Sequence, residues 1–410
     1  SSTSSTSSTL SIHKICWRYL KDIFTQLKES RPMEILRSTQ HRTNYLLVKQ
    51  ARIVAMTSTH AALKQDSFLR VGFHYDSLIM EESAQTLEIE SFIPLLLQDR
   101  SKQIGTASRL GSSLRRVVMI GDHHQLPPVV QNHVLQRSTN LDQSMFTRFI
   151  RLGLNSHYLD AQGRCRPSLC KLFAWAYVNA SPDGRPLQNL PAVDPSSPTS
   201  EKRWKLANAG FAHDYQFIDV KDGKETAPVS YFYQNLVEAE FLVATFQWMR
   251  LIGYPACQIS ILTTYNGQKT LIREIVEKKC ANNPRFGRPH KITTVDKYQG
   301  QQNHYILLSL VKTKHVGHIR DVRRLIVAMS RARLGLYIFG NKALFENCYE
   351  LSPVFQQLLK RSTQLQLVQN EAFPTQREIF DNNQTMIYTI QNMQHLVSIV
   401  QFALQTTNYQ

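Results

Sequence analysis

Two adjacent acids follow a short apolar run of the chain, an arrangement suited to phosphoryl transfer. The run 75–80 reads as a strand and is followed directly by Glu81 and Glu82, with Gln85 three residues further on. In the hydrolysis of a nucleoside triphosphate, a magnesium ion bridges phosphate oxygens and a carboxylate orients or deprotonates the attacking water. Two neighbouring carboxylates can divide these tasks, so we expect Glu81 to hold Mg²⁺ and Glu82 to activate water.

A second polar cluster follows a second apolar run. Residues 116–120 are apolar and rich in β-branched side chains, which predicts a buried strand, and the sequence Gly-Asp-His-His-Gln-Leu-Pro-Pro occupies 121–128. The carboxyl ends of parallel strands are where open α/β folds bind nucleotides. We expect the carboxamide of Gln125 to hydrogen-bond a γ-phosphate or the attacking water.

The negative charge of a transferred phosphoryl group requires fixed cations, and arginine suits this role because its guanidinium stays charged and can bind in a bidentate manner. Arg164 lies in Gln-Gly-Arg at 162–164, and Arg331 lies near the end of a predicted helix. The catalytic candidates are therefore Glu82, Gln125, Arg164 and Arg331.

The charge of the whole chain favours a nucleic-acid partner. It has 48 Lys and Arg against 31 Asp and Glu, a formal net charge of +17, and an excess of this size is typical of nucleic-acid binders. Hydroxyls and amides at strand ends can hold phosphates, and the candidates for such RNA contacts are Thr57, Thr59, His60 and Thr294. A stripe of seven Lys and Arg between 312 and 333 could follow a phosphate backbone or simply meet solvent.

The hydrophobic periodicity predicts an α/β fold with parallel sheets. Strands are expected at 52–57, 75–80, 116–120, 259–263, 305–311 and 334–339, and helices at 15–27, 233–251, 267–279 and 321–331. Strands that alternate with helices of ten or more residues indicate a parallel sheet with crossover connections. The predicted regions are a disordered Ser/Thr-rich start (1–13), a first domain (14–180), a linker (181–210), a second domain (211–360) and a Gln-rich tail with one helix near 393–403 (361–410).

The composition also excludes several classes of protein. The six cysteines have no Cys-x-x-Cys spacing, so neither a zinc cluster nor a disulfide scaffold is expected. No apolar run approaches the roughly 20 residues of a membrane span, and we expect no membrane partner. Residues 1–10 lack the apolar core of a signal peptide.

In their order along the chain, these segments resemble the motifs of superfamily 1 helicases of the nonsense-decay and senataxin-like branch. Segments 57–60, 81–85, 121–128 and 162–164 are similar to motifs Ic, II, III and the Gln-Tyr-Arg segment, and 261–268, 293–302 and 327–333 to motifs IV, V and VI. Within this branch the resemblance is closer to the intron-binding helicases of the spliceosome, through 80–85, 88–98, 159–164 and 265–289. It covers roughly residues 14–405.

The resemblance implies two RecA-like parallel-sheet domains, the first incomplete at its amino-terminal end. It implies an RNA-dependent ATPase with 3′-to-5′ unwinding that uses ATP and Mg²⁺ and binds intronic RNA of pre-mRNA. It further implies spliceosomal protein partners, a role in pre-mRNA splicing and a nuclear location. Carried over position by position, the ATP-binding residues are Glu81, Gln125, Gln162, Arg164, Gln302 and Arg331.

Several positions depart from the family pattern. Glu81 stands where the superfamily has Asp, Gly163 where the branch has a Tyr that stacks on adenine, and Gln302 where motif V has Glu. The phosphate loop Gly-x-x-x-x-Gly-Lys-Ser/Thr is absent from the 410 residues, and the only Gly-Lys pair, at 223–224, precedes Glu225. We therefore expect a carboxy-terminal portion of a helicase that is inactive in isolation.

Two alternative functions remain open from the sequence. The chain could be a non-catalytic RNA-binding or assembly module that keeps the fold for its contacts alone. It could also be a senataxin-like helicase that acts on DNA or RNA–DNA hybrids.

Overall fold

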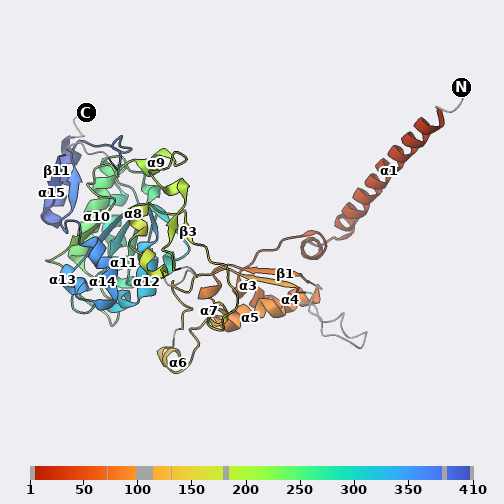
Figure 1. Cartoon of the computed structure of the whole chain (residues 1–410), viewed down its shortest axis with the longest axis horizontal. Helices are drawn as coiled ribbons and strands as arrows, with labels where there is room; N and C mark the ends of the chain where they lie inside the picture. Colours follow the sequence, from red (N-terminus) through yellow and green to blue (C-terminus); the bar gives the residue numbers. More distant parts are fainter. Residues whose placement is uncertain are drawn as a thin grey trace. The chain divides into compact units, whose positions relative to one another are not determined.

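The computed structural model describes residues 5–71, 73–97, 114–130, 132–178, 184–380 and 386–406. The chain forms two compact units (Figure 1). The first unit comprises Ser1–Gly121 and Pro128–Phe149, and the second comprises Asp122–Pro127 and Ile150–Gln410. The region predicted as the first domain, 14–180, thus contributes residues to both units.

The first unit holds a small parallel sheet. Strand β1 (Ser77–Met80) pairs in parallel with β2 (Arg116–Met119), in a register that runs from Ser77 opposite Arg116 to Met80 opposite Met119. Both strands lie where the apolar runs predict them. They are not buried as expected, since Ile79 is 66% exposed and Val118 49% exposed. The reason is that the described sheet has only these two strands.

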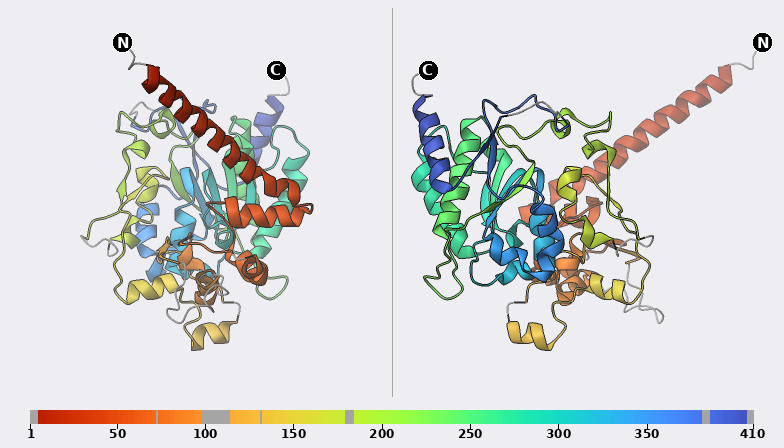
Figure 2. Two further views of the ribbon diagram at one scale, coloured as in Figure 1. Left: turned by 90° about the vertical axis from the view of Figure 1, so that its right-hand side faces the viewer. Right: turned by 60° about the vertical axis from the view of Figure 1, so that its left-hand side comes forward.

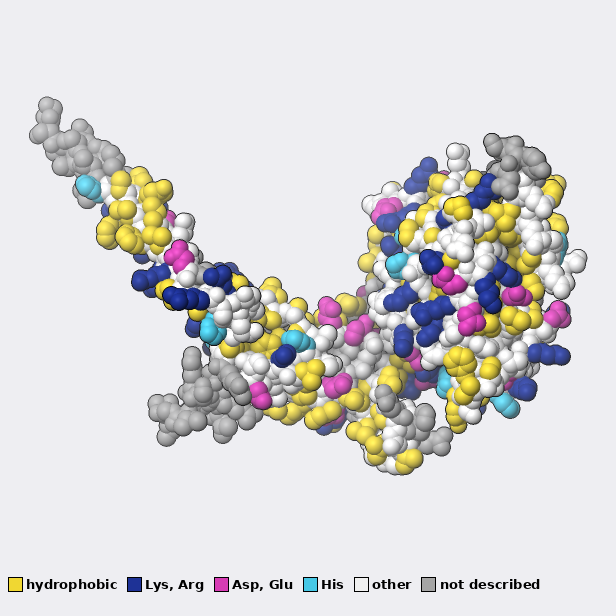
Figure 3. Space-filling view, turned by 180° about the vertical axis from the view of Figure 1, so that it is seen from behind, with side chains coloured by type: hydrophobic (Ala, Val, Ile, Leu, Met, Phe, Trp, Pro, Cys, Tyr) yellow, Lys and Arg dark blue, Asp and Glu magenta, His cyan; other side chains and the backbone are white. Residues whose placement is uncertain are grey.

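The other elements of the first unit are helices. They are α1 (Ser5–Ile35), α2 (Thr39–Tyr45), α3 (Ser58–Leu63), α4 (Gln65–Arg70), α5 (Glu88–Leu96), α6 (His133–Ser138) and α7 (Met145–Arg151), which crosses into the second unit. Helix α1 begins within the stretch for which the sequence predicts disorder. Its apolar side chains, including Trp17 and Phe24, are exposed. Figure 3 shows apolar side chains of this helix in yellow.

The strand predicted at 52–57 does not form. None of the described residues pairs with this segment as a neighbouring strand, so the segment is a connection. It ends at Thr57, whose hydroxyl accepts a hydrogen bond from the backbone N–H of His60 at 3.1 Å and caps α3.

The second unit contains a five-stranded sheet in the order β5-β9-β8-β6-β7, and all its pairs are parallel. Its strands are β5 (Tyr215–Asp219), β6 (Ile259–Thr263), β7 (Lys291–Thr294), β8 (Asn303–Ser309) and β9 (Ala332–Gly340). The crossover helices are α10 (Leu236–Leu251), α11 (Asn266–Val276) and α12 (Val322–Met329). The strands predicted at 259–263, 305–311 and 334–339 and their helices are thereby confirmed.

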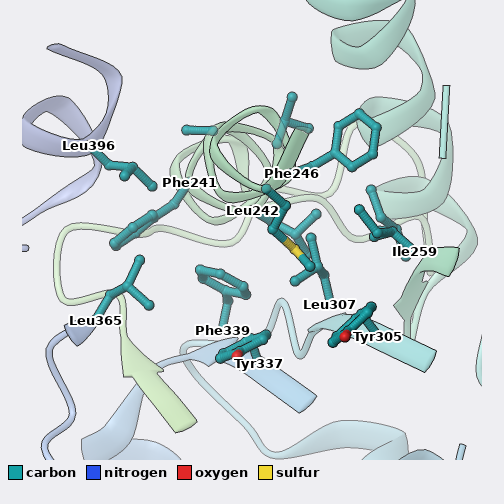
Figure 4. Close-up of a cluster of buried hydrophobic side chains, with 14 of the residues drawn as sticks. Phe241, Leu242, Phe246, Ile259, Tyr305, Leu307, Tyr337, Phe339, Leu365 and Leu396 are labelled. Carbon is teal, nitrogen blue, oxygen red and sulfur yellow. The ribbon is translucent and has the colours of Figure 1, made fainter. Parts of the chain in front are cut away.

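Four of the five strands (β5, β6, β8 and β9) contribute to two apolar cores, one on each face of the sheet. In β8, Tyr305 and Leu307 point into the core around α10, whereas Ile306 and Leu308 point into the core around α12. Figure 4 shows the first of these cores, in which the ring of Phe241 of α10 packs edge to face on Phe339 of β9. A strand buried on both faces reads as a continuous apolar run, which explains why these strands are clear in the sequence.

The smaller elements surround this sheet. They are β3 (Ala161–Gln162), α8 (Pro167–Cys170), β4 (Gln188–Asn189), α9 (Lys202–Lys205), α13 (Lys342–Glu346), α14 (Ser352–Leu358), β10 (Gln366–Val368), β11 (Ile387–Thr389) and α15 (Met393–Thr406). Strands β3 and β4 pair in parallel, and β10 and β11 pair antiparallel.

The carboxy-terminal segment is part of the core, although its composition suggests a peripheral tail. Leu365, Leu396 and Val400 are buried against α10, and α15 lies beside that helix (Figure 2). The Gln and Asn residues of this segment obscure its few apolar positions in the sequence. The segment predicted as a linker is likewise anchored, because Val193 and Trp204 are buried in the same core, while residues 181–183 lie outside the described part.

Candidate functional site

The two acids after β1 lie on a distorted turn of the first unit. Glu82 adopts the left-handed conformation with φ 51° and ψ 33°, which is unfavourable for a residue with a side chain. The turn is fixed by Ser83, whose backbone N–H and hydroxyl both donate to the carbonyl oxygen of Ile120 at 2.9 Å. The side-chain amide of Gln85 donates to the carboxylate of Glu82. These hydrogen bonds therefore hold Glu82 in one orientation despite its unfavourable backbone conformation.

Gly121 is required by the close approach of this turn to β2. A Cβ at position 121 would lie 2.8 Å from the backbone nitrogen of Ala84 and 3.0 Å from its Cβ. Only glycine lets the chain leave β2 alongside the acidic turn.

Glu81 has the properties of a magnesium ligand that shares its ion with a nucleotide. Its side chain is exposed, and within the described chain its carboxylate has no hydrogen-bond or ion-pair partner. No group of three or more His, Cys, Asp or Glu side chains in that part of the chain could hold a metal ion by itself. Mg²⁺ commonly takes one or two carboxylates and completes its shell with water and substrate phosphates, which fits a single free carboxylate.

Asp122 organises the segment 122–127 within the second unit. Its carboxylate accepts hydrogen bonds from the backbone N–H of His124 at 2.9 Å, the amide of Gln125 at 2.7 Å and the hydroxyl of Tyr177 at 2.6 Å. Burial raises the pKa of Tyr177, and the negative charge of Asp122 raises it further. Tyr177 therefore remains a protonated donor.

Because its amide nitrogen is held by Asp122, Gln125 presents its oxygen to Arg331. The Oε1 atom of Gln125 accepts from Nη2 of Arg331 at 3.3 Å. Arg331 is 1% exposed and also donates to the carbonyl oxygens of Val327 and Gln301 and, at 2.6 Å, to the hydroxyl of Ser330. The predicted γ-phosphate contacts Gln125 and Arg331 thus form one hydrogen-bonded group.

The second predicted arginine joins the same group through Ser330. Arg164 donates from Nη1 to the carbonyl oxygen of Ser330 at 3.3 Å and from Nε to Oε1 of Gln302 at 2.9 Å. The backbone N–H of Arg164 donates to Oε1 of Gln162 at 2.8 Å. Among the described residues, Nη2 of Arg164 has no hydrogen-bond partner, which leaves a charged donor for an anion.

The structure thus brings together Gln125, Gln162, Arg164, Gln302 and Arg331 within the second unit. Glu81 and Glu82 belong to the first unit and are described separately. Gln302 and Arg331 immediately precede β8 and β9, two neighbouring parallel strands, so this group lies at the amino-terminal edge of the five-stranded sheet.

Three residues that position this group were not identified as site residues: Asp122, Tyr177 and Ser330. Asp122 could have been found, since a carboxylate three residues before Gln125 can hold its amide. Tyr177 and Ser330 carry no such signal, because their contacts depend on the tertiary fold.

Gly163, at the position of the family tyrosine, faces Leu190. A Cβ on residue 163 would lie 2.9 Å from Cδ1 of Leu190, so a side chain there requires this leucine to move. Leu190 follows β4, whose pairing with β3 fixes the segment. A tyrosine at position 163 therefore does not fit the packing of this segment.

The predicted RNA contacts fall in both units. Thr57, Thr59 and His60 lie exposed at the start of α3 in the first unit. Thr294 ends β7 in the second unit and pairs in register with Thr263, the last residue of β6. Thr294 thus lies at the carboxyl edge of the five-stranded sheet, opposite the edge that carries Arg331.

A buried polar network supports this carboxyl edge. Glu238 of α10 accepts hydrogen bonds from the hydroxyl of Ser309 at 2.6 Å and from the backbone N–H of Val311 at 2.8 Å. Val311 has φ 73°, which is strained for a β-branched residue, and its carbonyl oxygen accepts from Asn235. Burial raises the pKa of Glu238 to about 7. These bonds hold the chain as it leaves β8.

The basic stripe between 312 and 333 is largely neutralised. Four of its seven cations pair with acids, at distances of 2.7–3.1 Å: Lys312 with Glu225, Arg320 with Glu350, Arg323 with Asp321, and Arg324 with Asp296. Arg331 is buried, and Arg333 lies over the ring of Trp204 with 5.4 Å from its Cζ to the ring centroid. The stripe is therefore mostly structural. Lys and Arg side chains are spread over the face that Figure 3 shows.

All six cysteines are free thiols. A helix with the length and apolarity needed to span a bilayer does not occur among the described residues.

Comparisons with known proteins identify relatives of this chain. Two family models, both described as an AAA domain, match residues 21–133 and 141–343. The chain is 52% identical to RNA helicase aquarius of Mus musculus over 96% of its length, and 31% identical to pre-mRNA-splicing factor cwf11 of Schizosaccharomyces pombe over 93%. It is 28% identical to a regulator of nonsense transcripts 1 homolog of Arabidopsis thaliana over 82%. It covers 26%, 28% and 25% of these relatives, about a quarter of their length.

Proposed function

The chain belongs to the AAA-domain helicase family of RNA helicase aquarius and its relatives, and from this premise we propose that it is the helicase portion of an ATP-dependent RNA helicase that acts in pre-mRNA splicing. One observation carries the proposal. Arg164 and Arg331, from segments more than 160 residues apart, both hydrogen-bond Ser330 beside Gln125. This arrangement gathers the cations that stabilise a phosphoryl transition state.

In the proposed reaction, Arg164 and Arg331 stabilise the negative charge on the γ-phosphate. Gln125 senses the phosphate with its amide, which Asp122 and Tyr177 hold in one orientation. Gln162 and Gln302 act through Arg164, because both of them hydrogen-bond it. Glu82 is the general base for the attacking water.

Magnesium is proposed to bind Glu81, whose carboxylate is exposed and unpaired within the described chain. The ion would neutralise phosphate charge when bound. The serine and lysine of a phosphate loop are not among the 410 residues.

The nucleic acid is proposed to be RNA, through Thr57, Thr59, His60 and Thr294. The names of the two relatives that match more than 90% of the chain support this choice, since one is an RNA helicase and the other a pre-mRNA-splicing factor. We further propose, from the motif resemblance, that the RNA is intronic pre-mRNA, that the protein partners are spliceosomal, and that the protein acts in the nucleus.

The proposal is tested with a chimaera in which this chain replaces the matching quarter of mouse RNA helicase aquarius. We expect RNA-stimulated ATP hydrolysis by the chimaera and a loss of at least about 100-fold when Glu82→Gln removes the base. The isolated chain is expected to hydrolyse no ATP, because it has no phosphate loop. An active Glu82→Gln chimaera would contradict the catalytic role, and an inactive chimaera with intact RNA binding would favour the assembly module.

A further inference from the structure

An exposed tyrosine of the second unit is held in a strained conformation. Tyr231 has φ 63°, in the left-handed region that residues with a Cβ rarely adopt, and it is 86% exposed. Its side chain makes no hydrogen bond or ring contact with the residues that the structure describes. No contact of the ring with the described residues therefore offsets the backbone strain. Residues strained in this way are frequent at ligand sites.

The residues on either side of Tyr231 anchor its loop. The backbone N–H of Phe232 donates to the carbonyl oxygen of Val229 at 2.9 Å, and Thr226 and Gln234 exchange two backbone hydrogen bonds at 2.8 Å. Nζ of Lys312 lies 3.5 Å from the centre of the Tyr233 ring. With both flanks fixed, Tyr231 is presented outward on a rigid support.

This loop packs against the carboxyl edge of the five-stranded sheet. The side-chain amide of Gln234 donates to the carbonyl oxygen of Gly267 at 3.2 Å. A Cβ on Gly267 would lie 2.5 Å from the carbonyl oxygen of Tyr233, so glycine permits the close contact. Gly267 lies in the first turn of α11, which begins just after β6, and β6 ends beside Thr294. Tyr231 therefore belongs to the same edge as the proposed RNA contact.

The surroundings of this edge are basic. Lys269 of α11 has a lowered pKa, because it is partly buried and because Arg273 and Lys297 lie near it. Nζ of Lys269 donates to the amide oxygen of Asn266, a neutral partner. The nearby acid Asp296 is already paired with Arg324. This local excess of positive charge favours a polyanion over a protein partner.

We propose that Tyr231 is a stacking platform for an unpaired base of single-stranded RNA bound along this edge. The inference rests on the proposed RNA-binding function and adds a residue that contacts a base rather than a phosphate. An aromatic ring with both faces open to solvent, beside cations that hold the backbone, is the arrangement that binds single strands without sequence preference.

The test uses the whole chain and short single-stranded RNAs that carry 2-aminopurine at one position. Binding is followed by anisotropy, and stacking by the loss of 2-aminopurine fluorescence. We expect Tyr231→Ala to weaken binding by about 5- to 150-fold, the range of base–aromatic stacking, and to abolish the quenching. Tyr231→Phe should retain both signals. Tyr349→Ala is the matched control, because Tyr349 is 88% exposed on the same unit and has no strained backbone.

Tyr231→Gly separates the ring from the backbone. It relieves the left-handed strain, so its melting temperature should lie about 2–4 °C above that of Tyr231→Ala, while its RNA affinity should be as low. Unchanged affinity in Tyr231→Ala, equal losses in Tyr231→Ala and Tyr349→Ala, or full affinity in Tyr231→Gly would overturn the platform. These results leave the proposed function intact, whereas no RNA binding by the unaltered chain would overturn both.

Discussion

Glu238 makes the stability of the second unit depend on pH. Its carboxyl is completely buried beneath the carboxyl edge of the sheet, and the donors that it meets among the described residues are all neutral: the Ser309 hydroxyl, the Asn235 side-chain amide and backbone N–H groups. Burial dominates and raises the pKa from 4.5 to about 7. An acid whose folded pKa is raised contributes stability that is fully present below about pH 4.5 and is lost as the pH rises through 7.

The magnitude follows from the two pKa values. Between pH 5 and pH 8 the unfolded chain releases the Glu238 proton before the folded unit does, and this difference lowers the free energy of unfolding by about 2.5 kcal/mol. That is a large fraction of the 5–15 kcal/mol typical of a folded domain. Most of this decrease in the free energy of unfolding should occur between pH 5 and 7.

The assay compares the wild-type chain with Glu238→Gln in urea titrations at a series of pH values. Tryptophan fluorescence reports the second unit when Trp17, exposed on α1, is replaced by Phe in both proteins. Burial lowers the pKa values of the partly buried His124 and His213, and their titration changes the stability with the opposite sign. The difference between the two curves removes their contribution, because both proteins contain them.

We expect Glu238→Gln to gain about 2.5 kcal/mol relative to wild type as the pH rises from 5 to 8. Parallel curves would refute the reasoning, since they would mean that Glu238 ionises in the folded protein near its ordinary pKa.

Three further predictions concern other parts of the site. Arg331→Met should cost about 3–5 kcal/mol in urea unfolding, because it leaves buried acceptors unpaired, whereas Gln125→Ala should cost about 1 kcal/mol; equal costs would contradict the structural weight given to Arg331. Lys312→Met should lower the free energy of unfolding by about 3–5 kcal/mol, because it leaves Glu225 buried without its partner. Adding Glu225→Gln should recover part of this loss. Strictly additive costs in the double-mutant cycle would argue against the buried pair. Gly121→Ala should speed amide hydrogen exchange in the acidic turn of the first unit by forcing the backbone apart, and unchanged exchange would show that the turn adapts.

The motif order predicted the family, and the comparisons confirm it. The central strands were predictable because burial on both faces gives continuous apolar runs, as in residues 259–263. Residues 52–57 are also largely apolar but form a connection, since a strand needs a neighbouring strand and none of the described residues supplies one. The integration of Leu396 and Val400 was missed for a related reason, because their partner α10 lies about 150 residues earlier.

The sequence could predict which residues form the proposed site, but it could not predict their geometry. Arg164 and Arg331 stand out as charged residues in short motifs, but their common contact with Ser330 depends on how two distant segments fold together. The left-handed conformation of Glu82 could not be read from the sequence either, because glutamate rarely adopts it. The roles of these residues in catalysis remain predictions.

The two edges of the five-stranded sheet are joined by rigid elements, and this connection bears on how nucleotide and RNA could influence each other. Helix α12 ends at Met329, two residues before Arg331 at the amino-terminal edge. At its other end, Arg324 pairs with Asp296, two residues after Thr294 at the carboxyl edge. Strand β8 also connects the two edges. It begins at Asn303, next to Gln302, and ends at Ser309, whose hydroxyl donates to Glu238. A movement of Arg331 toward a phosphate must therefore either carry α12 with it or break the buried hydrogen bonds at one end. Since buried bonds are costly to break, α12 should move together with Arg331, whereas its exposed ion pair with Asp296 can break at lower cost.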